Sequence, residues 1–176
     1  MKKTILLVML VFAFACDKDD HDNETLPPAT QSGKGTFACY VDGKAFIDKS
    51  GGWFNCFYQF VEGEYYFSIE GEVNTNKNTN TPWGISLGTI GRTLSTGDII
   101  QLGEDINTSG GAFFTFSINN SEYSTTNQDY LGELKITKMD FTSHIVSGTF
   151  WFDVKHPITG ETVEIREGRF DTLFTQ

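Results

Sequence analysis

The sequence predicts an all-β protein and, within that class, an antiparallel β-sandwich of about nine or ten strands. From residue 35 onward, apolar and polar residues alternate with a period of two, and almost no window shows the spacing of an amphipathic helix. The alternating segments are rich in Phe, Tyr, Ile, Val and Thr, and turn signals containing Gly or Asn separate them about every 8 to 12 residues. A sandwich suits this spacing best, and a lipocalin-like β-barrel is the alternative.

The expected strands follow one another closely in the first half of the domain. Asp42–Gly43 and Glu62–Gly63 are turn signals between alternating segments. The run 74–82 is rich in Asn and Thr, so we expect a long exposed loop there. The first five expected strands are 37–41, 44–47, 53–60, 65–73 and 84–90.

The second half of the domain contains one predicted irregularity. In the last strand Val163 and Ile165 point to one face, but Phe170 and Phe174 fall on the opposite parity. A one-residue slip at Glu167–Gly168 restores a continuous apolar face, so we expect a β-bulge there. The remaining expected strands are 98–102, 111–119, 130–139, 145–155 and 162–174.

The chain has the length of one domain and is strongly acidic. Its 176 residues include 13 Lys+Arg and 23 Asp+Glu, which gives a net charge of -10. Its 16 Phe, 6 Tyr and 3 Trp supply enough apolar surface for a packed core. No run of Lys and Arg is present to neutralise phosphates, so the composition argues against nucleic acid as a partner.

The N-terminus predicts export and attachment to a membrane. Lys2 and Lys3 precede an apolar run over 5–15, which is the layout of a signal peptide and is too short to span a bilayer. The run ends at Ala13-Phe14-Ala15-Cys16, which resembles a bacterial lipobox. The resemblance implies that residues 1–15 are removed and that Cys16 carries acyl chains such as palmitate, which would anchor the protein to the membrane. An ordinary signal peptidase site beside an unrelated cysteine is the alternative.

The next segment, 16–34, is expected to be a disordered acidic spacer, with the β-sandwich domain occupying 35–176. Leu26 is its only large apolar residue, so it has little surface to bury. Lys18-Asp19-Asp20 resembles an export signal of Bacteroidota-type lipoproteins and implies an outer-membrane location, exposed on the cell surface. A periplasm-facing lipoprotein and a simple solvated linker are the alternatives.

Two cysteines and one threonine are candidates for covalent chemistry within the domain. Cys39 and Cys56 both point inward by parity on expected neighbouring strands, so they form either a disulfide or two buried free thiols. Their spacing and the lack of a nearby His argue against a metal site. Asp171-Thr172-Leu173 resembles a short acceptor motif for O-glycosylation in Bacteroidota-type exported proteins, with Thr172 as the attachment site.

Tryptophans are the best candidates for contact with a ligand. Trp151 lies on the polar face of its expected strand and Trp83 follows the expected loop, so each could stack on a sugar ring or anchor a partner. The alternative is that these rings, with Trp53, only cover the ends of the sandwich. No catalytic motif is present, and the sequence implies neither a metal ion nor a cofactor. Glu64, Glu70 and Glu72 share one strand face and are expected to be solvated.

Several motifs resemble small Bacteroidota-type exported lipoproteins of unknown function. The matching stretches are Val41-Asp42-Gly43-Lys44 at the start of the domain, and Gly148-Thr149-Phe150 followed by the run 163–170 at its end. This resemblance implies an all-β lipoprotein domain and carries no catalytic residues with it. The leading hypothesis is therefore a non-catalytic, membrane-anchored domain that binds a glycan or a protein. A lipocalin-like carrier of a small apolar ligand and a small glycan-active hydrolase are the alternatives.

Overall fold

The computed structural model describes residues 25–48, 56–73, 83–103, 110–117 and 122–176. Cys16, Trp53, the signal peptide and the expected loop 74–82 lie outside the described residues, and so does the side chain of Trp83. Within the described ranges, no helix has the length and apolar character needed to cross a membrane.

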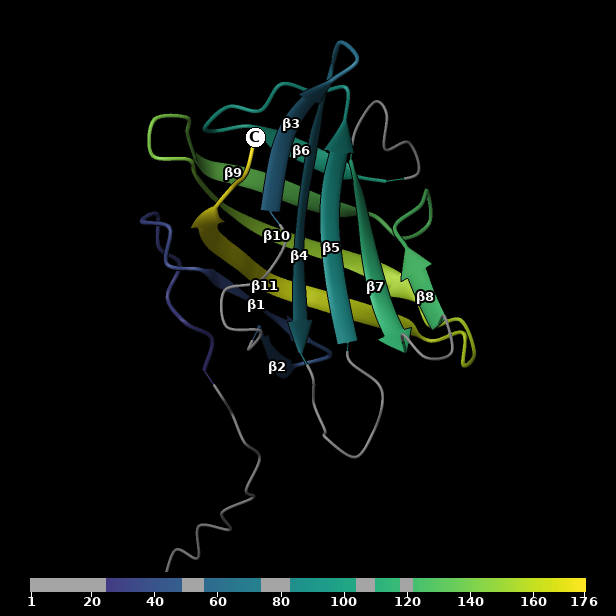
Figure 1. Ribbon diagram of the computed structural model, residues 1–176. Helices are drawn as coiled ribbons and strands as arrows, with labels where there is room; N and C mark the ends of the chain where they lie inside the picture. The colour runs from purple at the N-terminus through teal and green to yellow at the C-terminus, as the bar shows by residue number, and fades with distance from the viewer. Residues whose placement is uncertain (1–24, 49–55, 74–82, 104–109, 118–121) are drawn as a thin grey trace, which may run out of the picture.

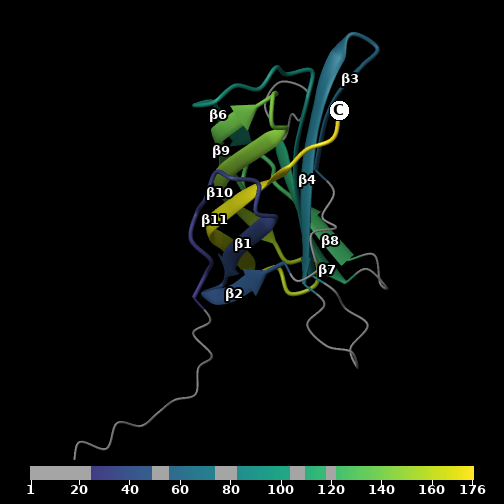
Figure 2. The ribbon, with the colours of Figure 1, turned by 60° about the vertical axis from the view of Figure 1, so that its left-hand side comes forward.

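Two antiparallel sheets pack face to face, which confirms the predicted β-sandwich (Figures 1 and 2). The six-stranded sheet has the order β2-β1-β11-β10-β9-β6, and the five-stranded sheet has the order β3-β4-β5-β7-β8. The two sheets remain separate, so the lipocalin-like barrel is not formed. The strands are β1 (Thr36–Val41), β2 (Lys44–Ile47), β3 (Cys56–Val61), β4 (Glu64–Val73), β5 (Trp83–Ile90), β6 (Ile99–Leu102), β7 (Gly111–Ser117), β8 (Glu122–Thr125), β9 (Gly132–Asp140), β10 (Ile145–Lys155) and β11 (Thr162–Leu173).

Two tight turns build the hairpins that the sequence predicts. Asp42 and Gly43, between β1 and β2, have φ angles of 48° and 76°. Glu62 and Gly63, between β3 and β4, have φ angles of 52° and 94°. A two-residue turn with both residues in the left-handed region has the twist that antiparallel strands need, so these sequence signals set the strand register locally.

Aromatic side chains fill the space between the two sheets. The ring centroid of Phe37 on β1 lies 5.2 Å from that of Phe150 on β10. The rings of Phe67 on β4 and Phe170 on β11 lie 6.4 Å apart and connect the two sheets. The sheets approach so closely that a Cβ at Gly71 would lie 2.4 Å from the ring of Phe37. The aromatic residues that a carrier would use to line a cavity therefore pack against one another.

The last strand contains the predicted bulge. Phe150 of β10 pairs with Gly168 and Phe152 pairs with Ile165, so Arg166 and Glu167 together oppose a single residue of β10. Glu167 has a φ of 51°, which places it in the left-handed region. The extra residue returns the apolar side chains on both sides of it to the core, as the parity of the sequence requires.

The prediction of a disordered spacer is wrong for residues 25–34. This stretch lies along the outer side of the six-stranded sheet (Figure 2). Hydrogen bonds to Asp171 hold it there, and Gly35 donates its backbone N–H to the Asp171 carbonyl. The segment has little apolar surface to bury, and polar contacts to one carboxylate order it instead. We call residues 25–34 the docked segment.

Candidate functional site

A hollow at the described surface surrounds Trp151, on the outer face of the six-stranded sheet. Its volume is about 380 Å³. Trp151 is 39 % exposed and is one of the residues that the sequence proposed as a ligand contact. We call this hollow the Trp151 groove. Its lining consists of Ala29, Glu133, Thr149, Phe150, Trp151, Glu167, Gly168 and Arg169.

Strand pairing places Trp151 between two carboxylates. On one side, Trp151 pairs with Glu133 of β9. On the other side lies the bulge of β11, which brings Glu167 to the groove. Neighbouring strands are about 4.8 Å apart, so the two acids approach the indole from opposite sides within about two strand spacings.

The bulge also fixes the floor of the groove. A Cβ at Gly168 would lie 2.5 Å from ring atoms of Phe150, the core residue directly opposite. Only glycine fits this position without moving that ring, because real Cβ atoms do not approach so closely. The predicted bulge therefore shapes both the core below and the groove above.

An ion-paired arginine holds the indole in place. The Arg166 guanidinium carbon lies 5.7 Å from the centroid of the Trp151 ring. Its Nη1 donates to Asp153 Oδ1 at 2.6 Å, and its Nη2 lies 3.2 Å from Glu164 Oε1. The hydrogen bond with Asp153 is the main cause that raises the pKa of Arg166, and the charges of Asp153 and Glu164 add to it. These ion pairs hold the cation over the ring, where it attracts the face of the indole.

Arg169 connects the bulge to the docked segment. Its Nε donates to the Glu167 carbonyl at 3.1 Å, and its Nη2 donates to Glu167 Oε2 at 3.3 Å. Its Nη1 donates to the carbonyl of Pro27 at 3.3 Å. The docked segment contributes Ala29 to the groove wall, so a stretch expected to be a spacer is part of the site.

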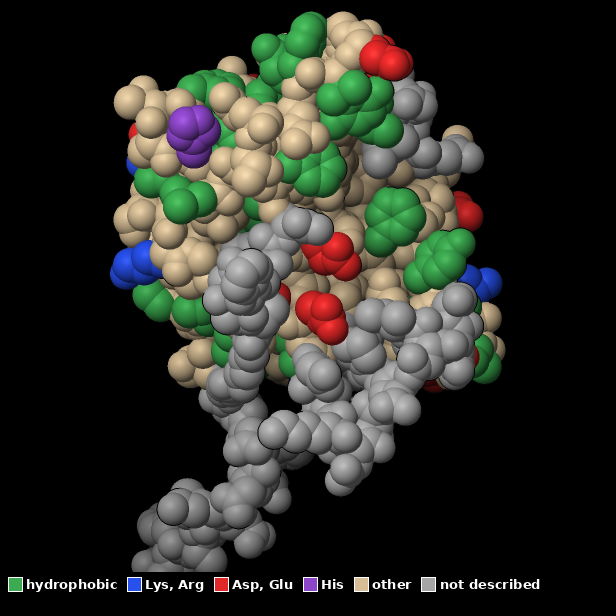
Figure 3. Space-filling view, in the orientation of Figure 1, with side chains coloured by type: hydrophobic (Ala, Val, Ile, Leu, Met, Phe, Trp, Pro, Cys, Tyr) green, Lys and Arg blue, Asp and Glu red, His purple; other side chains and the backbone are tan. Residues whose placement is uncertain are grey.

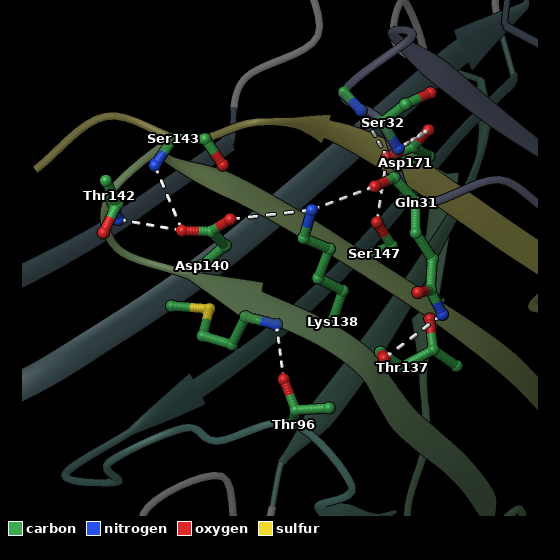
Figure 4. A network of polar contacts seen from close by, with 12 residues as sticks. Gln31, Ser32, Thr96, Thr137, Lys138, Asp140, Thr142, Ser143, Ser147 and Asp171 are labelled. Atoms are coloured by element: carbon green, nitrogen blue, oxygen red, sulfur yellow. Dashed lines mark hydrogen bonds and ion pairs between the residues drawn. The ribbon is translucent and has the colours of Figure 1, made fainter.

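A fully buried carboxylate anchors this wall (Figure 4). Asp171 Oδ2 accepts from Thr30 Oγ1 at 2.6 Å and from the Ser32 N–H at 2.9 Å. Its Oδ1 accepts from the Gly33 N–H at 2.7 Å and from Ser147 Oγ at 2.8 Å. Burial alone would raise the pKa of Asp171, but these hydrogen bonds outweigh it and lower the pKa to about 2. The carboxylate is therefore ionised at neutral pH, and it also accepts from the Lys34 N–H at 3.3 Å, so it holds four residues of the docked segment and Ser147.

A second set of hydrogen bonds holds the same part of the docked segment, between Thr30 and Ser32 (Figure 4). Gln31 Nε2 donates to the carbonyl of Thr137 at 3.2 Å, and Lys138 Nζ donates to the carbonyl of Gln31 at 3.1 Å. Lys138 Nζ also lies 3.6 Å from Asp140 Oδ2. The segment is therefore held at β9 as well as at β11.

The two cysteines are buried free thiols. Cys39 lies on β1 of the six-stranded sheet and Cys56 on β3 of the five-stranded sheet, so the expectation of neighbouring strands in one sheet is wrong. Burial raises the pKa of both thiols far above the usual range, which keeps them protonated and unreactive. The sequence left open a disulfide or two buried free thiols, and the structure contains the free thiols.

The other predicted site residues lie apart from the groove. Thr172 is only 6 % exposed and its hydroxyl donates to the Leu173 carbonyl, so its glycosylation would require local unfolding of β11. Trp83 begins β5 in the five-stranded sheet, so the fold does not bring it together with Trp151. Of the acids, Glu64, Glu70 and Glu72 are exposed on β4, as expected.

Sequence reasoning missed most of the polar residues around Trp151. Glu133, Arg169 and Asp171 reach this face from two strands, and nothing in their local sequence marks them as neighbours of Trp151. The parity break at Glu167–Gly168 was the one signal that could have pointed to the site, because a bulge redirects side chains. Among the described residues, no group of three or more His, Cys, Asp or Glu side chains is placed to hold a metal ion.

Fold and groove together define an all-β sandwich protein with a polar surface groove built around one exposed tryptophan. Residues 92–173 match a family described as a domain of unknown function (DUF6252). The matched stretch runs from just before β6 to the end of β11, so it includes Trp151, both flanking carboxylates and Arg169 but not the docked segment. Searches of curated proteins and of solved structures each gave no significant match.

Proposed function

We propose that this protein is a membrane-anchored lipoprotein whose β-sandwich binds a neutral glycan in the Trp151 groove. The observation that carries the proposal is the placement of an exposed indole between Glu133 and Glu167 in a groove that also contains Thr149 and Arg169.

The chemistry of these groups matches that of a sugar ring. The C–H face of a pyranose packs against an aromatic ring, while its hydroxyl groups donate to carboxylates and accept from a guanidinium. The groove carries both kinds of polar group, because Glu133 and Glu167 accept and Arg169 donates. The Arg166 guanidinium already lies over the ring of Trp151, which favours one orientation of the indole and reduces the ordering required on binding.

Attachment to the membrane rests on the sequence. The apolar run that stops at Cys16, followed at once by acidic residues, supports acylation of that cysteine. Two or more acyl chains give stable attachment, because each buried methylene contributes about 0.8 kcal/mol. We infer an outer-membrane location from the same segment. Replacing Cys16 by Ala should move the protein from the membrane fraction to the soluble fraction and abolish labelling with an acyl-chain analogue. Unchanged fractionation would refute the anchor.

The binding test uses the full-length protein on a glycan array, followed by titration calorimetry with the glycans that bind. Trp151→Ala should weaken binding by about tenfold or more, because a central aromatic contact is lost. Tyr123→Ala is the matched control, since Tyr123 is an exposed aromatic residue on the other sheet and should leave the affinity unchanged. Absence of glycan binding, or equal losses in the two variants, would overturn the proposal.

Glycan hydrolysis is the second candidate, because two carboxylates flank one aromatic ring. Glycosidases use such a pair at separations of about 5 to 10 Å. Chromatography of the bound oligosaccharide after incubation distinguishes the two functions. Intact ligand supports a binding protein, whereas shortened products that vanish in Glu133→Gln or Glu167→Gln would identify an enzyme.

A further inference from the structure

A second hollow lies on the outer face of the five-stranded sheet, on the opposite side of the sandwich from the Trp151 groove. Its volume is about 210 Å³. We call it the sheet cleft. Its lining consists of Phe57, Tyr66, Phe67, Ser68, Ser86, Leu87, Gly88, Thr89, Ile90 and Phe113.

The cleft exists because the middle of the sheet carries small side chains. Ser68 of β4 pairs with Gly88 of β5, and Ser86 lies two residues before Gly88 on the same strand. Phe67 and Leu87 point the other way and are buried in the core. The floor of the cleft is therefore formed by two serines and one glycine, whose small size leaves space between the larger side chains around them.

Aromatic rings form the walls. Phe57 of β3 pairs with Ser68, and Phe113 of β7 pairs with Ser86, so the two phenyl rings stand on opposite sides of the floor. Tyr66 adds a third ring from β4. Phe113 is 40 % exposed, which leaves its ring accessible to a ligand.

The charge of this sheet is entirely of one sign. Its five strands contain four Glu residues and no Lys, Arg or His. In Figure 3, which views this side of the molecule, acidic and hydrophobic side chains occupy the middle and basic ones appear only at the margins. Glu70 pairs with Ser86 in the strand register and shares a side-chain hydrogen bond with it, so a carboxylate stands at the rim of the cleft.

We propose that the sheet cleft binds a small organic cation, a ligand whose substituted ammonium group sits between the rings of Phe57, Tyr66 and Phe113. The faces of aromatic rings attract such cations, and they do so more strongly where the cation is partly removed from water. The Glu70 carboxylate supplies the opposite charge at the rim, and the repulsion between Glu70 and Glu72 decreases when a cation binds. The charges of Glu70 and Glu72 would repel an anion, and a purely apolar ligand would gain nothing from these charges.

The test uses the full-length protein and choline chloride, with 3,3-dimethylbutan-1-ol as the neutral analogue of nearly the same shape. Calorimetric titration should show binding of choline that is about tenfold tighter than that of the alcohol. Phe113→Ala and Glu70→Gln should each weaken choline binding severalfold, while Tyr123→Ala and Trp151→Ala should leave it unchanged. Both cleft positions are exposed, so a thermal melt confirms that the variants remain folded.

Equal affinities for choline and its neutral analogue would overturn the proposal, because the cleft would then recognise shape alone. The absence of choline binding at saturating concentration would overturn it as well. Neutral glucose, added in place of choline, provides a further check. Binding of glucose that is lost in Phe113→Ala would assign the cleft to sugars instead. The Trp151→Ala result distinguishes this site from the Trp151 groove. Each of the two proposals can therefore fail while the other holds.

Discussion

The two sheets share one core, yet their strands differ sharply in charge. The strands of the six-stranded sheet contain six basic and six acidic residues. Among the described residues its charged side chains form four ion pairs, and the docked segment covers part of its outer face. The strands of the five-stranded sheet contain four Glu and no basic residue. The charge of the six-stranded sheet is neutralised by its own side chains. Any positive charge that neutralises the five-stranded sheet must come from residues outside its strands.

The difference shows that an acidic residue can stabilise one sheet and cost free energy in the other. Asp171 is fully buried and receives hydrogen bonds from Thr30, Ser32, Gly33 and Ser147. A carboxylate with several donors is stabilised even when buried. Glu70, by contrast, has one hydroxyl partner and a neighbouring carboxylate. The same chemical group therefore has opposite effects, and substitutions can measure them.

The largest effect is expected at Asp171. Asp171→Asn should lower the free energy of unfolding by about 3 kcal/mol, because an amide leaves buried donors without an acceptor. Urea denaturation at pH 7 measures the change. Glu164→Gln on the same strand is the control, because its side chain is 59 % exposed and a surface ion pair contributes less than about 1 kcal/mol. Similar losses in the two variants would show that the carboxylate does not anchor the docked segment.

The same residue predicts an acid dependence of stability. The pKa of Asp171 is about 2 in the folded chain and about 3.9 when unfolded, so its contribution is complete above about pH 4 and is lost as the pH falls toward 2. Denaturation of Asp171→Asn between pH 5 and pH 2 should show a smaller decline than the parent. Part of the decline should remain, because hydrogen bonds from Ser143 and Thr142 also lower the pKa of Asp140 to about 2. Identical pH profiles would contradict the assignment.

Glycine-to-alanine substitutions should also affect the stability of the two sheets differently. Gly168→Ala places a Cβ 2.5 Å from ring atoms of Phe150 and should destabilise the fold by about 2 kcal/mol. In the five-stranded sheet, Gly84→Ala meets Thr115 only at 3.6 Å, an ordinary contact, and should change stability by less than about 1 kcal/mol. Thermal melts of the two variants make the comparison. A larger loss for Gly84→Ala would show that the bulge tolerates a side chain.

Those parts of the fold that depend on local signals could be predicted from the sequence. Period-two alternation gave the strands, Asp42–Gly43 and Glu62–Gly63 gave two turns, and a parity break gave the bulge. β8 was missed because Tyr123 is the only large apolar residue among its four, so the segment shows no apolar alternation. The pairing of β1 with β11 was not derivable, because it joins the two ends of the domain. That pairing also separates Cys39 from Cys56.

Of the Trp151 groove, the bulge at Glu167–Gly168 and the tryptophan itself could be predicted. Its side chain stands on the polar face of a well-defined strand, so parity was enough to mark it as exposed. Glu133 and Arg169 reach the groove through pairing between strands, which the sequence does not encode locally. The docked segment was missed because Asp171, the residue that holds it, lies more than 130 positions away in the chain.

The smallest expected change in stability is that of Glu70→Gln. The sign of this change tests the contrast between the two sheets most directly. Burial is the main cause that raises the pKa of Glu70, the charge of Glu72 raises it further, and the hydrogen bond with Ser86 lowers it. A raised pKa in the folded chain means that ionisation costs stability, so this cost appears as the pH rises above about 4. Glu70→Gln should therefore be at least as stable as the parent at pH 7, with a gain below about 1 kcal/mol, and should depend less on pH between 4 and 7. A clear loss of stability in urea denaturation would mean that a positive group already compensates this carboxylate in the free protein, and the contrast between the two sheets would then not hold.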